Sequence, residues 1–214
     1  MKFDDFSKQV SKIKNLTLPG ASSHYKMAPV ERVQELKAIK ARKTTPKKAG
    51  VMALFYSDVD DYTRLLLILR KTYQGVHSNQ IGFPGGKVER SDADLLATAL
   101  RETEEEVGAN PIHIHVVRSL TRIYIPPSNF EVQPYIGLYD KKAPFKIQET
   151  EVEALVEVPL TDFMDDSKVV NQRLTTSYSK QQIAVPAYKL NGYTVWGATA
   201  MMLSEIKELF KQVL

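Results

Sequence analysis

The segment of residues 81–110, IGFPGGKVERSDADLLATALRETEEEVGAN, decides the fold of this chain. Its second half runs without Gly or Pro for 16 residues, which favours a helix. Ser91 is a candidate N-cap, with Asp94 three residues later as in a capping box, and Gly108 fits the position just past a helix end. The segment therefore predicts a loop with a Gly-Gly pair, followed by a well-marked helix.

Carboxylates gather on one side of this predicted helix. At about 100° per residue, a narrow stripe expected to face the core holds Leu96, Leu100, Thr103 and Val107. Beside it, one arc of about 100° holds Glu102, Glu105 and Glu106. Like charges at these spacings repel, and acids near a helix C-terminus oppose the helix dipole. A divalent cation would remove both costs, which favours an Mg²⁺ or Mn²⁺ site. A solvated acidic surface stays open as the alternative interpretation.

Two neighbouring features strengthen the metal interpretation. Gly85 and Gly86 lie about 15 residues before the Arg-Glu-x-x-Glu-Glu run, and paired glycines let backbone come close to a ligand. Arg101 lies one turn before Glu105, where we expect a charge-assisted hydrogen bond. Because Mg²⁺ usually completes its shell with water and substrate phosphates, the pattern points toward a phosphate ester or anhydride as substrate.

On these residues, the segment resembles the Nudix box, G-x5-E-x7-R-E-U-x-E-E-x-G-U, in which U is an aliphatic residue. The match runs through Gly86, Arg101, Glu102, Glu105, Glu106 and Gly108. The segment departs from the box at Asp92, which stands where the box has Glu, and one extra residue precedes Arg101. Two aliphatic positions of the box hold Thr103 and Ala109.

The extra residue lengthens the loop of the box, and in this the segment resembles the coenzyme A diphosphatase (CoA pyrophosphatase) branch of the Nudix superfamily. Residues 77–86, HSNQIGFPGG, are similar to the H-x-G-Q-I-x-F-P-G-G segment of that branch. Residues 66–70 look like its L-L-x-x-R segment, and residues 126–134 and 195–200 look like further parts of it. The resemblance covers about residues 50–214.

The resemblance implies an α/β Nudix fold, in which a mixed β-sheet lies between helices. It implies an Mg²⁺- or Mn²⁺-dependent hydrolase that cuts the pyrophosphate of coenzyme A or acyl-CoA. The products would be 3′,5′-ADP and 4′-phosphopantetheine or its acyl form. Two alternatives stay open: another nucleoside diphosphate derivative as substrate, such as ADP-ribose or a dinucleoside polyphosphate, or a catalytically silent ligand sensor with the Nudix fold.

The resemblance also assigns roles to the acidic helix. Glu102 and Glu106 are implied as the first metal ligands, and Glu105 as a third ligand or as the group that orients the attacking water. Arg101 is implied to hold the glutamates in place, so the expected catalytic residues are Glu105, Arg101 and Glu102. A further acid from a later loop is a common addition in such enzymes, and the sequence leaves open whether Glu149 or Glu151 supplies it.

Substrate contacts are expected from residues that precede the helix. The candidates are Arg70, His77, Gln80, Gly85 and Gly86. For the arginine, a structural ion pair is the alternative to a phosphate contact. For the histidine and the glutamine, packing is the alternative to ligand binding, and the sequence does not decide between them.

Length and composition limit the remaining possibilities. A chain of 214 residues with 43% hydrophobic residues can bury one substantial core, which argues against a disordered protein. It has no Cys, so disulfides, thiolate metal sites and a Cys nucleophile are excluded. The apolar runs are far too short to cross a bilayer, and the first residues lack the apolar core of a secretory signal. We therefore expect a cytoplasmic protein that does not bind membranes.

The positive charge is concentrated near the N-terminus. Residues 1–50 hold 12 Lys and Arg against 4 Asp and Glu, whereas the rest of the chain holds 17 against 21. We predict a basic, helical N-terminal extension at residues 1–48 and a Nudix hydrolase domain at residues 49–214. The basic residues are either a solvated helical face or a contact for a polyanionic ligand. No aromatic residues are interleaved with them, so we expect a small-molecule partner and no nucleic acid. Whether the chain forms a homodimer stays open.

Hydrophobic periodicity predicts the elements around the central segment. Helices are expected at residues 2–16, 30–41 and 198–213, with a loop at 18–29 and a linker at 41–48. Strands are expected at residues 51–56, 64–70, 114–124, 131–139, 154–158, 183–190 and 193–196. The last two flank Asn191-Gly192, a strong signal for a tight hairpin.

Overall fold

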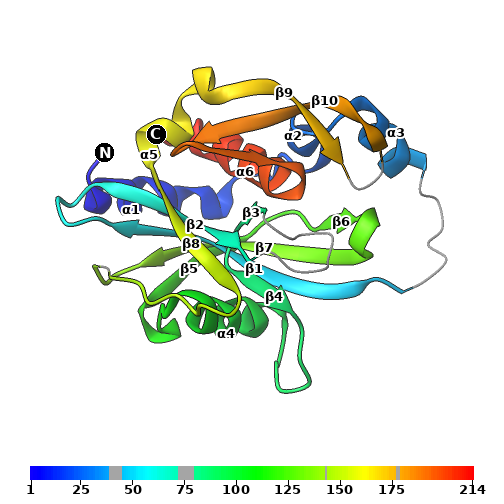
Figure 1. The fold of residues 1–214 in the computed structure, drawn as a ribbon. Coiled ribbons are helices and arrows are strands. Elements are labelled where there is room, and N and C mark those ends of the chain that lie inside the picture. Colours follow the sequence, from blue (N-terminus) through cyan, green and yellow to red (C-terminus); the bar gives the residue numbers. More distant parts are fainter. Residues whose placement is uncertain (39–44, 72–79, 143, 177–178) are drawn as a thin grey trace.

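The computed structural model describes residues 1–38, 45–71, 80–142, 144–176 and 179–214. In these parts the chain forms two β-sheets with helices packed against them, so the predicted α/β class is confirmed. Figure 1 shows a helix below the larger sheet and further helices with the smaller sheet above it. No helix in the described parts is both long and apolar enough to cross a membrane.

The larger sheet is mixed. Among the described residues it has eight strands: β1 (Lys47–Ser57), β2 (Thr63–Arg70), β3 (Ile81–Gly82), β4 (Gly85–Lys87), β5 (Ile114–Ser119), β6 (Ile123–Ile125), β7 (Phe130–Tyr139) and β8 (Val152–Pro159). The central β1 pairs with β7 in parallel, and with β2 and the short β4 antiparallel. The strands predicted at residues 51–56 and 64–70 are confirmed as β1 and β2, which form a hairpin around residues 58–62.

The smaller sheet contains β9 (Val169–Thr176), β10 (Ser179–Leu190) and β11 (Tyr193–Trp196), in the order β11-β10-β9. The predicted hairpin between β10 and β11 is confirmed. Its turn residues Asn191 and Gly192 have φ angles of 46° and 80°, as a tight hairpin of this kind requires.

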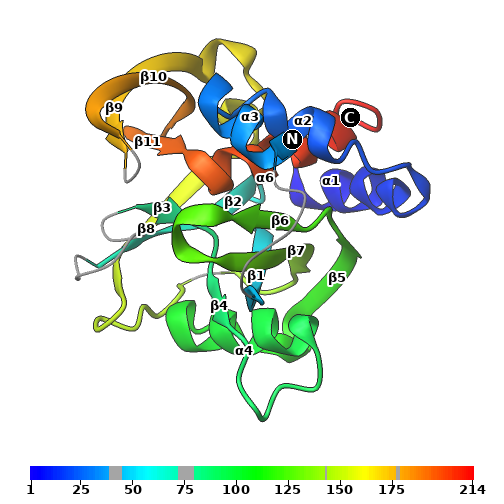
Figure 2. The same ribbon diagram turned by 90° about the vertical axis from the view of Figure 1, so that its right-hand side faces the viewer.

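Helices cover both faces of the larger sheet. The helix α4 (Leu95–Val107) packs on one face, where Ala99 and Val107 join the buried Met52 and Leu54 of β1. On the other face lie α1 (Phe3–Val10) and α6 (Gly197–Phe210), whose Phe6 and Phe210 rings contact Phe55 of β1 at centroid distances of 5.2 Å each. The predicted sheet between helices is therefore confirmed, and Figure 2 shows the same layers from the side.

The shorter helices are mostly connectors. They are η1 (Ser11–Asn15), α2 (Ala21–Tyr25), α3 (Val30–Ala38), η2 (Pro111–His113), η3 (Pro126–Ser128), α5 (Leu160–Met164) and η4 (Asp166–Lys168). The amphipathic helix predicted near the N-terminus is confirmed, because Phe6, Val10 and Ile13 are fully buried.

Two predictions for the N-terminal region were wrong in part. The expected loop at 18–29 contains α2, because Gly20, at a φ of 62°, lets the chain turn into a helix that is held against α6 by buried His24. The expected linker at 41–48 ends in Lys47 and Lys48, which belong to β1 and pair with β7, whereas residues 41–44 lie outside the described part. The boundary between residues 48 and 49 stays a prediction.

The prediction of a single strand at residues 114–124 was also wrong, because the chain leaves the sheet between β5 and β6. At the break, the backbone N–H and the hydroxyl of Thr121 donate to the buried carboxylate of Glu205 on α6. This partner is distant in sequence, so local alternation could not reveal it.

Candidate active site

The glycine pair lies on β4, directly against the acidic helix. A Cβ atom on Gly86 would lie 2.4 Å from Oε2 of Glu102, and one on Gly85 would lie 2.4 Å from the carbonyl oxygen of Gly50. Gly85 also has a φ of 140°, which side chains rarely adopt. Only glycine therefore lets this strand approach both β1 and the glutamates of α4 so closely.

Glu106 is the most buried of the three glutamates, with 1% of its surface exposed. Its carboxylate accepts hydrogen bonds from the N–H of Gly85 at 2.8 Å and from Nη1 of Arg70 at 2.9 Å. Burial raises the pKa of Glu106 to about 7, although Arg70 and the Gly85 N–H favour the charged form. The charges of Glu102 and Glu151 raise the pKa further.

Glu102 lies one turn earlier and is half-buried. Burial raises the pKa of Glu102 above its ordinary value, and the Arg101 guanidinium opposes that shift. The neighbouring charges of Glu105 and Glu151 again raise it. Glu105 itself has 52% of its side chain exposed and lies toward the solvent. The helix thus carries two partly desolvated carboxyl groups and one open to water.

Glu151 is the acid from a later loop that lies near this cluster. Its charge raises the pKa of both Glu102 and Glu106. Which of Glu149 and Glu151 joins the site stays a prediction.

Arg101 links the cluster to the preceding loop. Its Nε and Nη2 atoms contact the two carboxylate oxygens of Asp92 at 2.9 and 3.0 Å. Its Nη1 atom contacts Glu102 at 3.1 Å and Glu105 at 3.0 Å. The hydrogen bond from Arg101 holds the pKa of Asp92 well below its usual range. Asp92, which differs from the box, is therefore the forked partner that fixes the arginine.

The predicted start of the helix was wrong. Asp94, rather than Ser91, is the N-cap, and its side chain accepts from the N–H of Ala97 at 2.8 Å. The loop before it is held by Asp92, which also accepts from the Thr98 hydroxyl at 2.9 Å. The longer loop thus brings Asp92 back over the first turn of α4 to reach Arg101.

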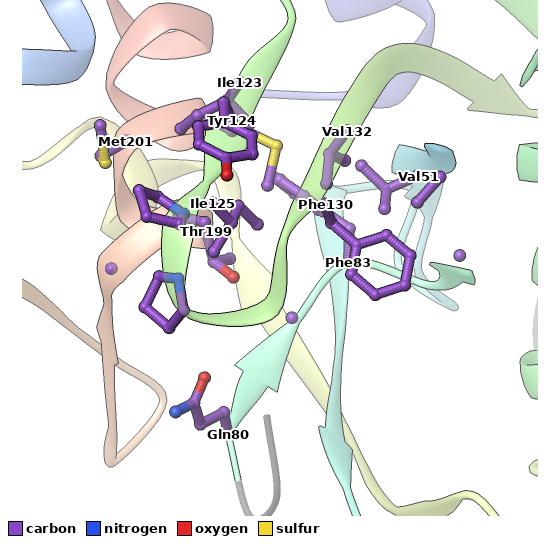
Figure 3. A pocket seen from close by; sticks show the side chains of 18 of the residues that line it. Val51, Gln80, Phe83, Ile123, Tyr124, Ile125, Phe130, Val132, Thr199 and Met201 are labelled. Carbon is purple, nitrogen blue, oxygen red and sulfur yellow. The ribbon is translucent and has the colours of Figure 1, made fainter. Parts of the chain in front are cut away.

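Four of the five predicted substrate residues line one cavity of about 310 Å³, namely Arg70, Gln80, Gly85 and Gly86. His77, the fifth, lies outside the described residues. Nη2 of Arg70 donates to the carbonyl of Gly85 at 2.6 Å, so this arginine has a structural contact and also borders the cavity. Figure 3 shows Phe83, Phe130 and Ile123 gathered around the cavity, with Gln80 at one end.

The carboxylates present fit a divalent cation whose coordination shell is completed by the substrate. In the parts of the chain that the structure describes, no three His, Cys, Asp or Glu side chains are gathered closely enough to hold an ion by themselves. However, Mg²⁺ commonly binds through one or two carboxylates together with water and substrate phosphates. Glu102 and Glu106 offer hard oxygen ligands, and burial raises the pKa of both carboxyl groups even though Arg101 and Arg70 pair with them.

Comparison with known proteins identifies the family. Residues 46–177 match the family model described as NUDIX domain. The chain belongs to the Nudix family. It is 33% identical over 162 residues to Nudix hydrolase 22, chloroplastic, from Arabidopsis thaliana. The aligned region covers 74% of this chain and 53% of that protein. It is also 33% identical over 146 residues to the uncharacterized Nudix hydrolase NudL from Salmonella paratyphi B, with 72% of that protein and 66% of this chain covered.

The chain thus spans about half the length of the plant relative. Among solved structures, a MutT/nudix family protein from Enterococcus faecalis matches with a TM-score of 0.54 at 17% identity, over 88% of this chain and 72% of that one. The Nudix hydrolase RenU from M. smegmatis matches with a TM-score of 0.54 at 12% identity, over 81% of this chain and 91% of that one. These similarities show the Nudix fold, and the coenzyme A branch stays a prediction.

Proposed function

We propose that this Nudix hydrolase cleaves the pyrophosphate of coenzyme A or acyl-CoA with the help of Mg²⁺ or Mn²⁺. The observation that carries the proposal is that Gly85 and Gly86 border a largely apolar cavity and also contact Glu106 and Glu102. A diphosphate beside this backbone would lie near the metal ligands, with space for an attached apolar group. The lead-in of residues 77–86 and the lengthened loop support coenzyme A as that substrate.

Glu102 and Glu106 would hold the metal, with Glu105 as the third acid. A bound divalent cation would neutralise phosphate charge and make a coordinated water more acidic. Glu105, the most exposed of the three, is suited to orient the attacking water. The water oxygen forms a bond to one phosphorus while the bridging P–O bond breaks, and the second phosphate leaves with the bridging oxygen. No covalent intermediate with the protein is required.

Two arginines prepare this arrangement. Arg101 holds Glu102 and Glu105 from the side of the Asp92 loop. Arg70 holds Glu106 and the Gly85 carbonyl, and its position at the cavity suits a contact with a phosphate oxygen. Both residues thus position the cluster by fixed hydrogen bonds, which limits reorganisation during the reaction.

Chromatography of coenzyme A after incubation with the protein and Mg²⁺ tests the proposal. We expect 3′,5′-ADP and 4′-phosphopantetheine in equal amounts, and no reaction when the metal is chelated. Intact coenzyme A beside turnover of ADP-ribose or a dinucleoside polyphosphate would assign a different nucleoside diphosphate derivative. Inactivity on every diphosphate, equal to that of Glu106→Gln, would favour the ligand-sensor alternative. A cytoplasmic location and a homodimer stay predictions.

A further inference from the structure

The N-terminal extension contributes a wall to the cavity at the glycine pair. Three residues at the start of α3 and within it line the same cavity as Gly85 and Gly86: Pro29, Arg32 and Leu36. They precede the segment that matches the family model, which begins at residue 46. Figures 1 and 2 both show α3 above β6, and α4 at the opposite end of the molecule, below the larger sheet.

The surface around α3 is apolar. The aliphatic and aromatic members of this part of the lining are Leu36, Phe83, Ile123, Ile125, Phe130, Met201 and Met202. Polar side chains among them already have partners within the protein. The Thr199 hydroxyl donates to the carbonyl of Ile81 at 3.0 Å, Tyr124 donates to Asn129 at 3.0 Å, and Arg32 contacts Glu35 at 2.5 Å. This wall therefore offers a ligand mainly carbon surface.

A substrate with two chemically different halves should place its apolar half here. An adenine with a 3′-phosphate needs hydrogen-bonding groups and cations, because burying those polar groups without partners is costly. An acyl-pantetheine arm carries methyl groups and a hydrocarbon chain, whose burial against carbon is favourable. Of the cations in the lining, Arg32 and Arg70 are paired with Glu35 and Glu106, and Lys87 is exposed. The apolar part of the lining beside α3 therefore matches the second half better than the first.

We propose that α3 is a specificity element, and that Leu36 contacts the acyl-pantetheine arm of the substrate. The inference rests on the proposed function, since it assumes that the diphosphate beside Gly85 and Gly86 belongs to coenzyme A or an acyl-CoA. It gives the N-terminal extension a role in choosing the substrate rather than in the chemical step. Leu36 is a substrate-binding residue in this account, and its loss should change KM and leave kcat nearly unchanged.

The test compares Leu36→Ala with Val33→Ala. Both residues lie on α3 and pack partly buried against the same core, but only Leu36 lines the cavity. With octanoyl-CoA and Mg²⁺, we expect Leu36→Ala to raise KM about tenfold or more, because up to three carbon atoms that face the arm are removed. Its kcat, and the inhibition constant of 3′,5′-ADP, which has no arm, should stay within about twofold. Val33→Ala should leave all three values unchanged.

Two further variants keep the test decisive if truncation loosens the helix. Leu36→Met should restore the wild-type KM, whereas Leu36→Trp should raise KM for octanoyl-CoA more than for coenzyme A by filling the cavity. Equal effects of Leu36→Ala and Val33→Ala would overturn the inference. A parallel rise in the inhibition constant of 3′,5′-ADP would also overturn it, because the nucleotide half would then occupy the cavity.

Different results would contradict the proposed function and the role of α3. If the wild-type protein cleaves neither coenzyme A nor octanoyl-CoA, the proposed function is wrong and the inference falls with it. If it cleaves both and the two α3 variants behave alike, only the role of α3 is wrong.

Discussion

At the scale of single residues, the site depends on carboxyl groups that the fold desolvates. Glu106 is almost fully buried, and among the described residues Arg70 and the Gly85 N–H donate hydrogen bonds to its carboxylate. Burying a carboxylate is costly unless it is paired, so such a group is a strong candidate for a metal ligand. Its position at the edge of the buried stripe follows from the helix geometry, which the sequence already predicted.

Replacing Glu106 with Gln separates activity from stability. We expect Glu106→Gln to lower kcat at least about a hundredfold, because a ligand charge is lost at the reacting phosphate. In metal-free buffer its melting temperature should be similar to that of the wild type or higher, since a neutral amide is easier to bury than a carboxylate.

Glu104→Gln is the matched control for this change. Glu104 lies on the same helix but is exposed, outside the acidic arc. It should keep wild-type activity. A Glu106→Gln protein that hydrolyses its substrate normally would remove Glu106 from the metal site.

Arg101→Lys tests the forked contact between Arg101 and Asp92. A lysine cannot reproduce the two parallel hydrogen bonds of a guanidinium, so Glu102 and Glu105 should lose their fixed positions. We expect kcat/KM to fall about tenfold or more and the Mg²⁺ concentration for half-maximal activity to rise. Unchanged metal dependence would mean that Arg101 only stabilises the loop.

At the scale of elements, long segments with strong periodicity were predictable. The central strands β1, β2 and β7 and the helix α6 lie where alternation or helical spacing placed them. The strand β4 was not predicted, because three residues are too short to show alternation. Yet β4 carries the glycine pair, so the sequence identified these residues by their chemistry and not by their secondary structure.

Other elements depended on distant partners. The division between β5 and β6 follows from the contact of Thr121 with Glu205, which lies 84 residues later. Likewise, the start of α4 depends on Asp92 turning back toward Arg101, nine residues later. The acidic arc and the glycine pair were thus predictable from local spacing, whereas the apolar cavity and its α3 wall required the folded chain.

Gly86→Ala tests the close packing of β4 against α4. An added Cβ would lie 2.4 Å from a carboxylate oxygen of Glu102, so the carboxylate has to move out of its position. We expect activity to fall about tenfold or more, with a smaller effect on melting temperature. Gly82→Ala is the control, because its Cβ would lie 3.7 Å from the nearest heavy atom, an ordinary contact. Equal activity of the two variants would show that β4 tolerates a side chain beside Glu102.

At the scale of the whole molecule, one buried carboxylate joins the N-terminal region to the rest of the fold. Glu205 on α6 has no exposed surface and lies 3.1 Å from Nε2 of His24 on α2. It also accepts from the hydroxyl of Thr121 at 2.6 Å and the N–H of Gly20 at 3.2 Å. Three chain segments therefore meet at a single side chain, and α3 follows directly after one of them.

This contact makes the stability of the fold sensitive to acid. Burial alone would raise the pKa of Glu205, but hydrogen bonds from His24 and Thr121 outweigh it and hold the pKa below the ordinary value of 4.5. As the pH falls through that value, the unfolded chain binds a proton at this position while the folded chain does not. The stabilisation is therefore complete above the ordinary pKa and is lost as the pH falls through the lower pKa of the folded state.

Urea unfolding of Glu205→Gln at pH 7 and pH 4 measures this contribution. At pH 7 we expect the variant to lose about 1 to 3 kcal/mol of unfolding free energy, because buried hydrogen bonds to a charged group are weakened. At pH 4 the difference from the wild type should be smaller, since the wild type has begun to lose the same stabilisation. Glu208→Gln is the matched control on α6, where an exposed pair with Lys26 should contribute less than about 1 kcal/mol. A difference for Glu205→Gln that stays constant between the two pH values would show that hydrogen bonding alone, and not the charge of the carboxylate, holds the N-terminal region to α6.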